Sequence, residues 1–116
     1  MTARSAYGLW LENNYKKGQL LQFNAADEAI KAFVDQKMDA YAGLRPGLID
    51  VAAKLPGSRI LDGQFTAVQQ AVGTARANTV GAQFLKDFVE EAKASGLVAQ
   101  FIERHKVRGL SVAPKA

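Results

Sequence analysis

The apolar residues recur with the spacing of an α-helix in four stretches, which are residues 5–17, 28–37, 78–95 and 97–106. The third of these helices can be capped by Asn78 or Thr79. A fifth, shorter helix is expected over residues 47–54, because Pro46 presets φ for a first helical turn. The pattern therefore predicts five helices.

Shorter apolar runs that stop at turn residues predict four strands, at residues 19–23, from Met38, at 59–61 and at 67–72. The run from Met38 stops at Gly43, as is typical of a buried parallel strand. One strand precedes the helix at 28–37 and another follows it, so the two should be parallel in a right-handed βαβ unit. The predicted fold class is α/β, with helices packed on a parallel sheet.

The end of the Met38 strand is a candidate ligand site. In an open α/β sheet, small molecules bind where the carboxyl ends of strands meet the amino ends of helices, because free backbone N–H groups collect there. Leu44 and Arg45 occupy that position. We therefore expect both residues to face a ligand crevice.

The start of the first helix is a second candidate. With Ser5 as its N-cap, four backbone N–H groups and the Ser5 hydroxyl would point outward and suit a carboxylate. A plain surface cap is the alternative, and the residue types alone favour it.

Three segments together resemble a known family. They are the helix start Ser5-Ala6-Tyr7, the motif Lys37-x-Asp39-Ala40-x-x-Gly43-x-x-Pro46, and the run Ala67-Val68-Gln69-Gln70-Ala71-Val72-Gly73, which two helices follow. This order is similar to the second lobe of the extracellular solute-binding proteins of family 3, the type II periplasmic binding proteins of ABC transporters for polar amino acids. The resemblance implies that residues 1–66 and 67–72 form an α/β lobe with a return hinge strand. Residues 73–116 would then be helices that pack on a first lobe absent from this chain.

The resemblance also implies a function, which is non-catalytic binding of a small polar or anionic solute for ABC-transporter import. Backbone N–H groups of Ser5 and Ala6, with the Ser5 hydroxyl, would hold a carboxylate, and the Tyr7 ring would pack on the solute. Leu44 stands where the family carries an aspartate for the ligand's ammonium, and an apolar side chain cannot compensate a buried ammonium. We therefore expect a carboxylate-bearing solute, with Leu44 as an apolar wall and Arg45 as the anion partner.

The composition of the chain further narrows the classes of partner and of site that are expected. The 116 residues carry a net charge of +4, but the basic residues are dispersed, so a nucleic-acid partner is not expected. The chain has no cysteine and one histidine, His105, so neither a metal site, a cofactor nor a catalytic relay is expected. The alternatives are a small-molecule-sensing effector domain of a regulator and a dehydratase-type enzyme, although no convincing acid/base pair is present.

The sequence also gives an expectation for the protein's cellular location. The resemblance implies the periplasm; no signal peptide or membrane-spanning run opens the chain, so the cytoplasm is expected if Met1 is the true start.

Eight large apolar side chains of the two last helices should lack a covering layer, which predicts self-association as a two-fold dimer. They are Phe84, Leu85, Phe88, Val89, Leu97, Val98, Phe101 and Ile102.

Overall fold

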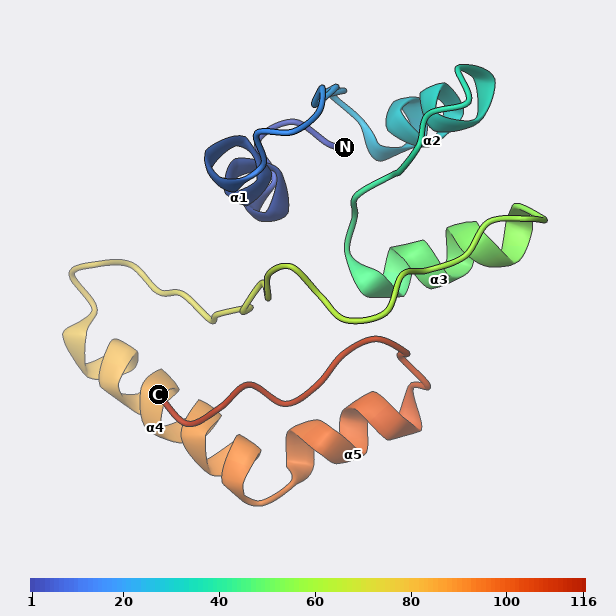
Figure 1. Cartoon of the computed structure of the whole chain (residues 1–116). Coiled ribbons are helices and arrows are strands. Elements are labelled where there is room, and N and C mark those ends of the chain that lie inside the picture. Colours follow the sequence, from blue (N-terminus) through green and yellow to red (C-terminus); the bar gives the residue numbers. More distant parts are fainter. The chain divides into compact units, whose positions relative to one another are not determined.

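The computed structural model describes residues 1–116 and contains five α-helices and no β-sheet (Figure 1). The helices are α1 (Ala6–Asn14), α2 (Ala26–Asp35), α3 (Arg45–Lys54), α4 (Thr79–Ala94) and α5 (Leu97–Arg104). The chain divides into two units, with α1 to α3 in unit 1 (Met1–Val68) and α4 and α5 in unit 2 (Gln69–Ala116). Each unit is described by itself.

The predicted α/β fold is wrong. The single β-pairing is an isolated parallel bridge between Thr2 and Phe23, and none of the four predicted strands forms. The run from Met38 is instead an extended connection from α2 to α3, in which the Tyr41 ring lies 6.2 Å from the Phe33 ring. A short apolar run can thus be partly covered without a strand partner, and its periodicity does not distinguish this case from a strand.

The predicted family membership is wrong for the same reason. The second lobe of a type II periplasmic binding protein is built on a parallel sheet, and this structure has no sheet. Residues 67–72, expected as a return hinge strand, form irregular chain. The resemblance therefore does not extend from the sequence to the fold.

Unit 1 is held together mainly by connecting segments, because α1, α2 and α3 make no close backbone contacts with one another. The N-terminal segment lies beside Phe23. The backbone N–H of Ala3 donates to the Phe23 carbonyl at 2.8 Å, and the N–H of Phe23 donates to the Met1 carbonyl at 3.0 Å. The small core of this unit contains Met1, Tyr7, Ala29 and Ala32.

Unit 2 consists of two helices joined by a short turn, followed by a returning tail. The side-chain oxygen of Asn78 accepts a hydrogen bond from the Gly81 N–H at 3.0 Å and so caps α4, as the sequence predicts. Gly96, with φ of 80°, makes the turn into α5, which packs on α4. Residues 107–116 then run back toward α4, where Lys93 Nζ donates to the Pro114 carbonyl at 2.8 Å (Figure 1).

Two helices end at a lysine in the left-handed region of φ. Lys37 (φ 50°) follows α2 and Lys106 (φ 52°) follows α5. At the end of α2, the N–H of Met38 donates to the Phe33 carbonyl at 3.1 Å, as in the Schellman motif. Glycine is the residue that adopts this conformation without steric cost.

Lys37→Gly is therefore expected to raise the free energy of unfolding by about 0.5 to 1 kcal/mol. The left-handed region costs an L-residue about 1 to 2 kcal/mol, and glycine's extra entropy in the unfolded chain offsets part of that gain. Urea unfolding followed by circular dichroism measures the change. Lys86→Gly, inside α4, is the matched control and should lose about 0.5 to 1 kcal/mol. Equal losses for both variants would contradict the described end of α2.

Candidate functional site

Ser5 is the N-cap of α1, as the sequence predicts. Its Oγ accepts a hydrogen bond from the Gly8 N–H at 3.1 Å and donates one to the Thr2 carbonyl at 2.7 Å. The hydroxyl thus links the first turn of α1 to the N-terminal segment. Both its donor and one acceptor position are used within the chain.

Ala6 and Tyr7 follow in the first turn of α1, where Ala6 is exposed and Tyr7 is buried. Tyr7 lies near Tyr41, whose pKa is raised, first by burial of its hydroxyl and then by the neighbouring Tyr7. A hydrogen bond with Thr2 acts in the opposite direction on the pKa of Tyr41. The Tyr7 ring is therefore part of the core of unit 1.

Leu44 and Arg45 lie at the start of α3, not at the end of a strand. Leu44 is the N-cap residue and its side chain is 48% exposed. Arg45 is the first helical residue, and its Nη2 donates a hydrogen bond to the Gly63 carbonyl. The guanidinium thus ties α3 to a later loop of unit 1, while its charge has no acidic partner.

The structure places the five predicted residues in two groups. Ser5, Ala6 and Tyr7 share the start of α1, whereas Leu44 and Arg45 share the start of α3. No hydrogen bond or ion pair joins the groups. Binding of a carboxylate by these residues stays a prediction.

Ser5→Ala is expected to lower the free energy of unfolding by about 1 kcal/mol, because the variant loses the cap of α1. Thermal melting with and without a dicarboxylate such as glutarate measures the effect. Ser111→Ala, whose hydroxyl makes no hydrogen bond, is the control and should change little. An equal fall in melting temperature with and without glutarate would leave Ser5 a cap only. A larger fall with glutarate would support the carboxylate site.

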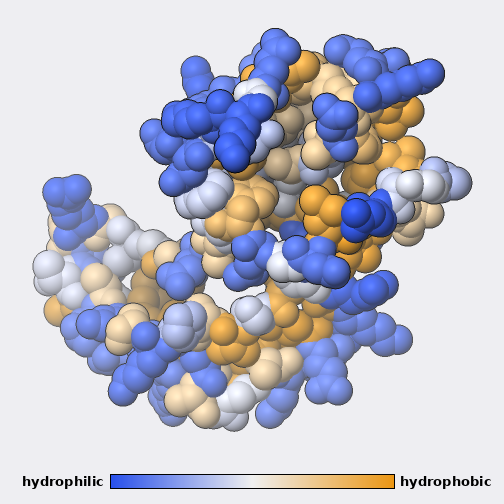
Figure 2. All heavy atoms as spheres, in the orientation of Figure 1, coloured by the Kyte–Doolittle hydropathy of each residue, from blue (hydrophilic) through white to orange (hydrophobic).

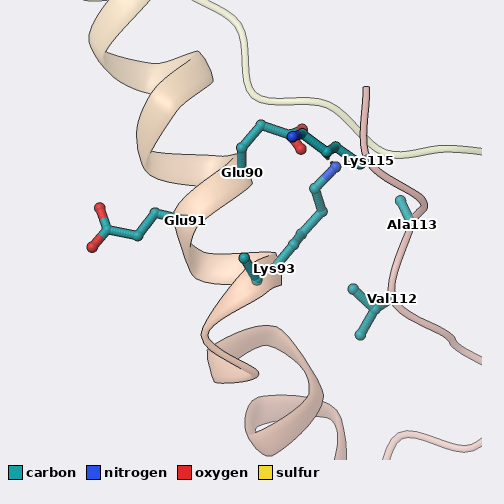
Figure 3. Close-up of a pocket in the computed structure, with 7 residues that line it drawn as sticks. Glu90, Glu91, Lys93, Val112, Ala113 and Lys115 are labelled. Carbon is teal, nitrogen blue, oxygen red and sulfur yellow. Dashed lines mark ion pairs between the residues drawn. The ribbon is translucent and has the colours of Figure 1, made fainter.

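An open cavity of about 410 Å³ lies in unit 2, between the last turns of α4 and the returning tail (Figure 3). Lys93 forms an ion pair with Glu90 at 2.6 Å, and the N–H of Ala116 donates to Glu90 Oε2 at 3.4 Å. Glu91 points away from this pair (Figure 3). The cavity therefore has one charged pair at its rim, and that pair also attaches the tail.

The hydrogen bond from Lys93 is the main cause that lowers the pKa of the Glu90 carboxyl, while burial opposes the shift. A lowered pKa means that the charged form is favoured in the folded chain. This contribution to stability is present above the unfolded pKa of glutamate and is lost as the pH falls through the folded value. The attachment of the tail therefore weakens in acid.

The most prominent surface feature of unit 2 is an apolar stripe along α4. Val80, Phe84 and Phe88 recur at every fourth residue and are 83%, 68% and 52% exposed. The Phe84 and Phe88 rings stack with centroids 6.3 Å apart and planes 13° from parallel. We call these three side chains the aromatic face of α4.

The sequence predicts exposure of Phe84 and Phe88 but misses Val80, although its fourth-residue spacing from Phe84 indicates the same side of the helix. Phe101 of α5 is also exposed, at 49%. Leu85, Val89, Leu97, Val98 and Ile102 are partly covered. Apolar side chains reach the surface among hydrophilic ones in Figure 2.

The structure gives less support to other kinds of functional site. No group of three histidine, cysteine, aspartate or glutamate side chains gathers where it could hold a metal ion. No helix combines the length and the apolar character needed to cross a bilayer. A second, shallow cavity of about 360 Å³ is lined by Phe23 and the exposed side of α2.

Comparisons with models of protein families, with curated proteins and with solved structures found no match. The functional argument therefore depends on the residues of this chain, and the aromatic face of α4 is its best-defined feature.

Proposed function

We propose that the chain is a non-catalytic binding module that docks on another polypeptide through the aromatic face of α4. The observation that carries the proposal is the exposure of Val80, Phe84 and Phe88 in one continuous stripe of a regular helix. Contiguous exposed apolar patches on soluble chains mark interaction sites, whereas single exposed apolar residues do not.

The stripe has the chemistry of a contact with an apolar polypeptide surface. Phenylalanine is enriched at the buried centres of protein interfaces, and its ring adds a large apolar area. Fully burying each of the three side chains is worth about 1.5 to 3 kcal/mol. Association costs about 4 to 15 kcal/mol, so further area beside the stripe must be buried as well.

The chain as a whole exposes more area than compact units of its size would. The chain exposes 9375 Å². If its 12.5 kDa is divided between two separate compact units in proportion to their residues, the expected area is about 7,400 Å². The excess of about 2,000 Å², summed over the whole chain, is larger than the roughly 800 Å² that each partner contributes to a standard protein interface.

Solute import, an effector role in a regulator and dehydratase activity stay predictions from the sequence. At the starts of α1 and α3, the side chains of Ser5 and Arg45 already form hydrogen bonds with backbone groups of this chain. The aromatic face of α4 favours the docking function instead, because its side chains are exposed in unit 2.

Site-specific photocrosslinking tests the proposal. Phe84 is replaced by p-benzoylphenylalanine in the full chain, and the same residue is placed at Lys86, on the opposite side of α4, as a matched control. Illumination of expressing cells should give covalent polypeptide adducts from position 84 and few from position 86. Equal yields at both positions, or no adduct at position 84, would contradict docking by this face.

A further inference from the structure

We infer that residues 101–110, which form the end of α5 and the bend that follows it, bind the surface of an anionic lipid bilayer (Figure 1). We call this segment the basic turn. The inference goes beyond the docking proposal and uses none of the residues of the aromatic face of α4. Its support is the combination of unpaired positive charge and exposed apolar side chains in one short segment of unit 2.

The basic turn has an excess of positive charge. Its lysine and arginine side chains are Arg104, Lys106 and Arg108, and all three are exposed. None of them donates a hydrogen bond or belongs to an ion pair of the structure. The one acidic side chain of the segment is Glu103, which follows Phe101 by two residues and so lies on nearly the opposite side of α5. Three cations are therefore available to an anionic partner.

Backbone hydrogen bonds hold the bend after α5. The N–H of Lys106 donates to the Glu103 carbonyl at 2.9 Å, and the N–H of Val107 donates to the Ile102 carbonyl at 3.1 Å. This is the pattern of the Schellman motif, with Lys106 in the left-handed region at φ 52°. Gly109, with φ of 85°, adds a second bend. Because backbone N–H groups satisfy these last carbonyls of α5, the basic side chains are not needed to cap the helix.

Exposed apolar side chains lie within the same segment. Phe101 is 49% exposed and Leu110 is 51% exposed. Arg104 follows Phe101 by three residues, so a cation and an aromatic ring share one side of α5. The boundary of an anionic bilayer offers phosphates to the cations and, within about 5 to 10 Å, an apolar layer to the other side chains. A nucleic acid offers phosphates and a stacking surface for Phe101, but no apolar layer for an aliphatic side chain such as Leu110.

The two kinds of side chain are both needed for binding. Each lysine or arginine near an anionic membrane surface strengthens binding about 5-fold, so three of them contribute about 100-fold. Stable attachment of a protein to a bilayer usually requires two signals, such as basic charge together with an apolar insertion. In the basic turn, Phe101 and Leu110 supply the second signal. We therefore expect reversible binding that weakens as the salt concentration rises.

Cosedimentation of the full-length chain with lipid vesicles tests the role of charge. The chain should bind vesicles of equal parts phosphatidylserine and phosphatidylcholine at least about 10-fold more tightly than vesicles of phosphatidylcholine alone. Arg108→Gln should weaken this binding about 5-fold. Lys86→Gln makes the same change of charge at an exposed position of α4 and should weaken it less than about 2-fold.

Lys106→Gly separates the loss of charge from a loss of structure. Glycine adopts the left-handed conformation of this position without steric cost, so the variant should have a higher midpoint in urea than the wild type. It should nevertheless bind the phosphatidylserine vesicles about 5-fold more weakly, because one cation is removed. Unchanged vesicle binding by both Lys106→Gly and Arg108→Gln would overturn the inference.

Insertion of the apolar side chains is tested with a fluorescent probe. The chain has no cysteine, so Leu110→Cys provides a single site for a nitrobenzoxadiazole label. Emission of this label should shift to shorter wavelength when phosphatidylserine vesicles are added. Ala99→Cys, exposed on nearly the opposite side of α5 from Phe101, is the matched control and should shift little.

Three results would contradict the inference. They are failure to bind vesicles of either composition, equal affinity for both compositions, and equal emission shifts from positions 99 and 110. Tighter binding to a single-stranded DNA oligonucleotide than to the phosphatidylserine vesicles, with no shift at position 110, would instead identify the partner as a nucleic acid and overturn the inference as well.

Discussion

Gly8→Ala is expected to lower the free energy of unfolding of unit 1 by about 1 to 3 kcal/mol. A Cβ atom at Gly8 would lie 2.7 Å from Ser5 Oγ and 3.2 Å from the Thr2 carbonyl oxygen. The Thr2 carbonyl belongs to the backbone, so it cannot move aside without shifting the segment that pairs with Phe23. The helix preference of alanine, about 1 kcal/mol over glycine, is too small to offset this overlap.

Gly47→Ala is the matched control. Gly47 also lies within the first turn of a helix, but no atom lies within 4 Å of the position of its added Cβ. Alanine should therefore stabilise the chain by about 0.4 to 1 kcal/mol. Urea unfolding of both variants should show opposite signs. A gain in both would mean that the N-terminal segment does not lie against α1.

The helices could be predicted because their signals are local. Ser5 and Asn78 stand one residue before α1 and α4, and both caps form as expected. The turn at Gly96 separates α4 from α5 at the predicted place. Each of these signals depends on residues within a few positions of the helix end, so the sequence contains all the necessary information.

The strands could not be predicted, because a strand forms only with a partner, and that partner is often distant in the sequence. Residues 19–23 are apolar enough for a strand, yet only Phe23 forms a β-bridge, and its partner in that bridge is Thr2. Nothing in the pattern of residues 1–3 indicates this pairing. The run from Met38 packs its Tyr41 ring near Phe33 instead of joining a sheet.

The candidate site, like the fold, was predicted correctly only where local residues determine the structure. The sequence predicts Arg45 near a helix start, which is correct, and at a strand end, which is not. The hydrogen bond from Arg45 to the Gly63 carbonyl joins residues 18 apart, and no local pattern indicates it. The sequence predicts exposure of Phe84 and Phe88 and misses Val80, and this prediction depends on a covering lobe implied by the resemblance, which the fold does not support.

Ala29→Asp is expected to have the largest effect of any single substitution in unit 1, a loss of about 3 kcal/mol or more at pH 7. Ala29 is 1% exposed, and the core around it contains no buried polar or charged side chain. A carboxylate there would lose its hydration and gain no partner. Loss of helical circular dichroism at pH 7, or a lowered midpoint in urea, measures the effect.

The pH dependence of Ala29→Asp distinguishes charge burial from simple crowding. Burial raises the pKa of a carboxyl group in the folded state, so its destabilising effect is smallest below the unfolded value of about 3.9 and grows as the pH rises. We expect a clearly smaller loss at pH 4 than at pH 7. Ala26→Asp, at the exposed start of the same helix, should change stability by less than about 0.5 kcal/mol, because the helix dipole favours a carboxylate there while Asp27 and Glu28 repel it. A loss for Ala29→Asp as small as that for Ala26→Asp would mean that α2 does not bury its Ala29 side.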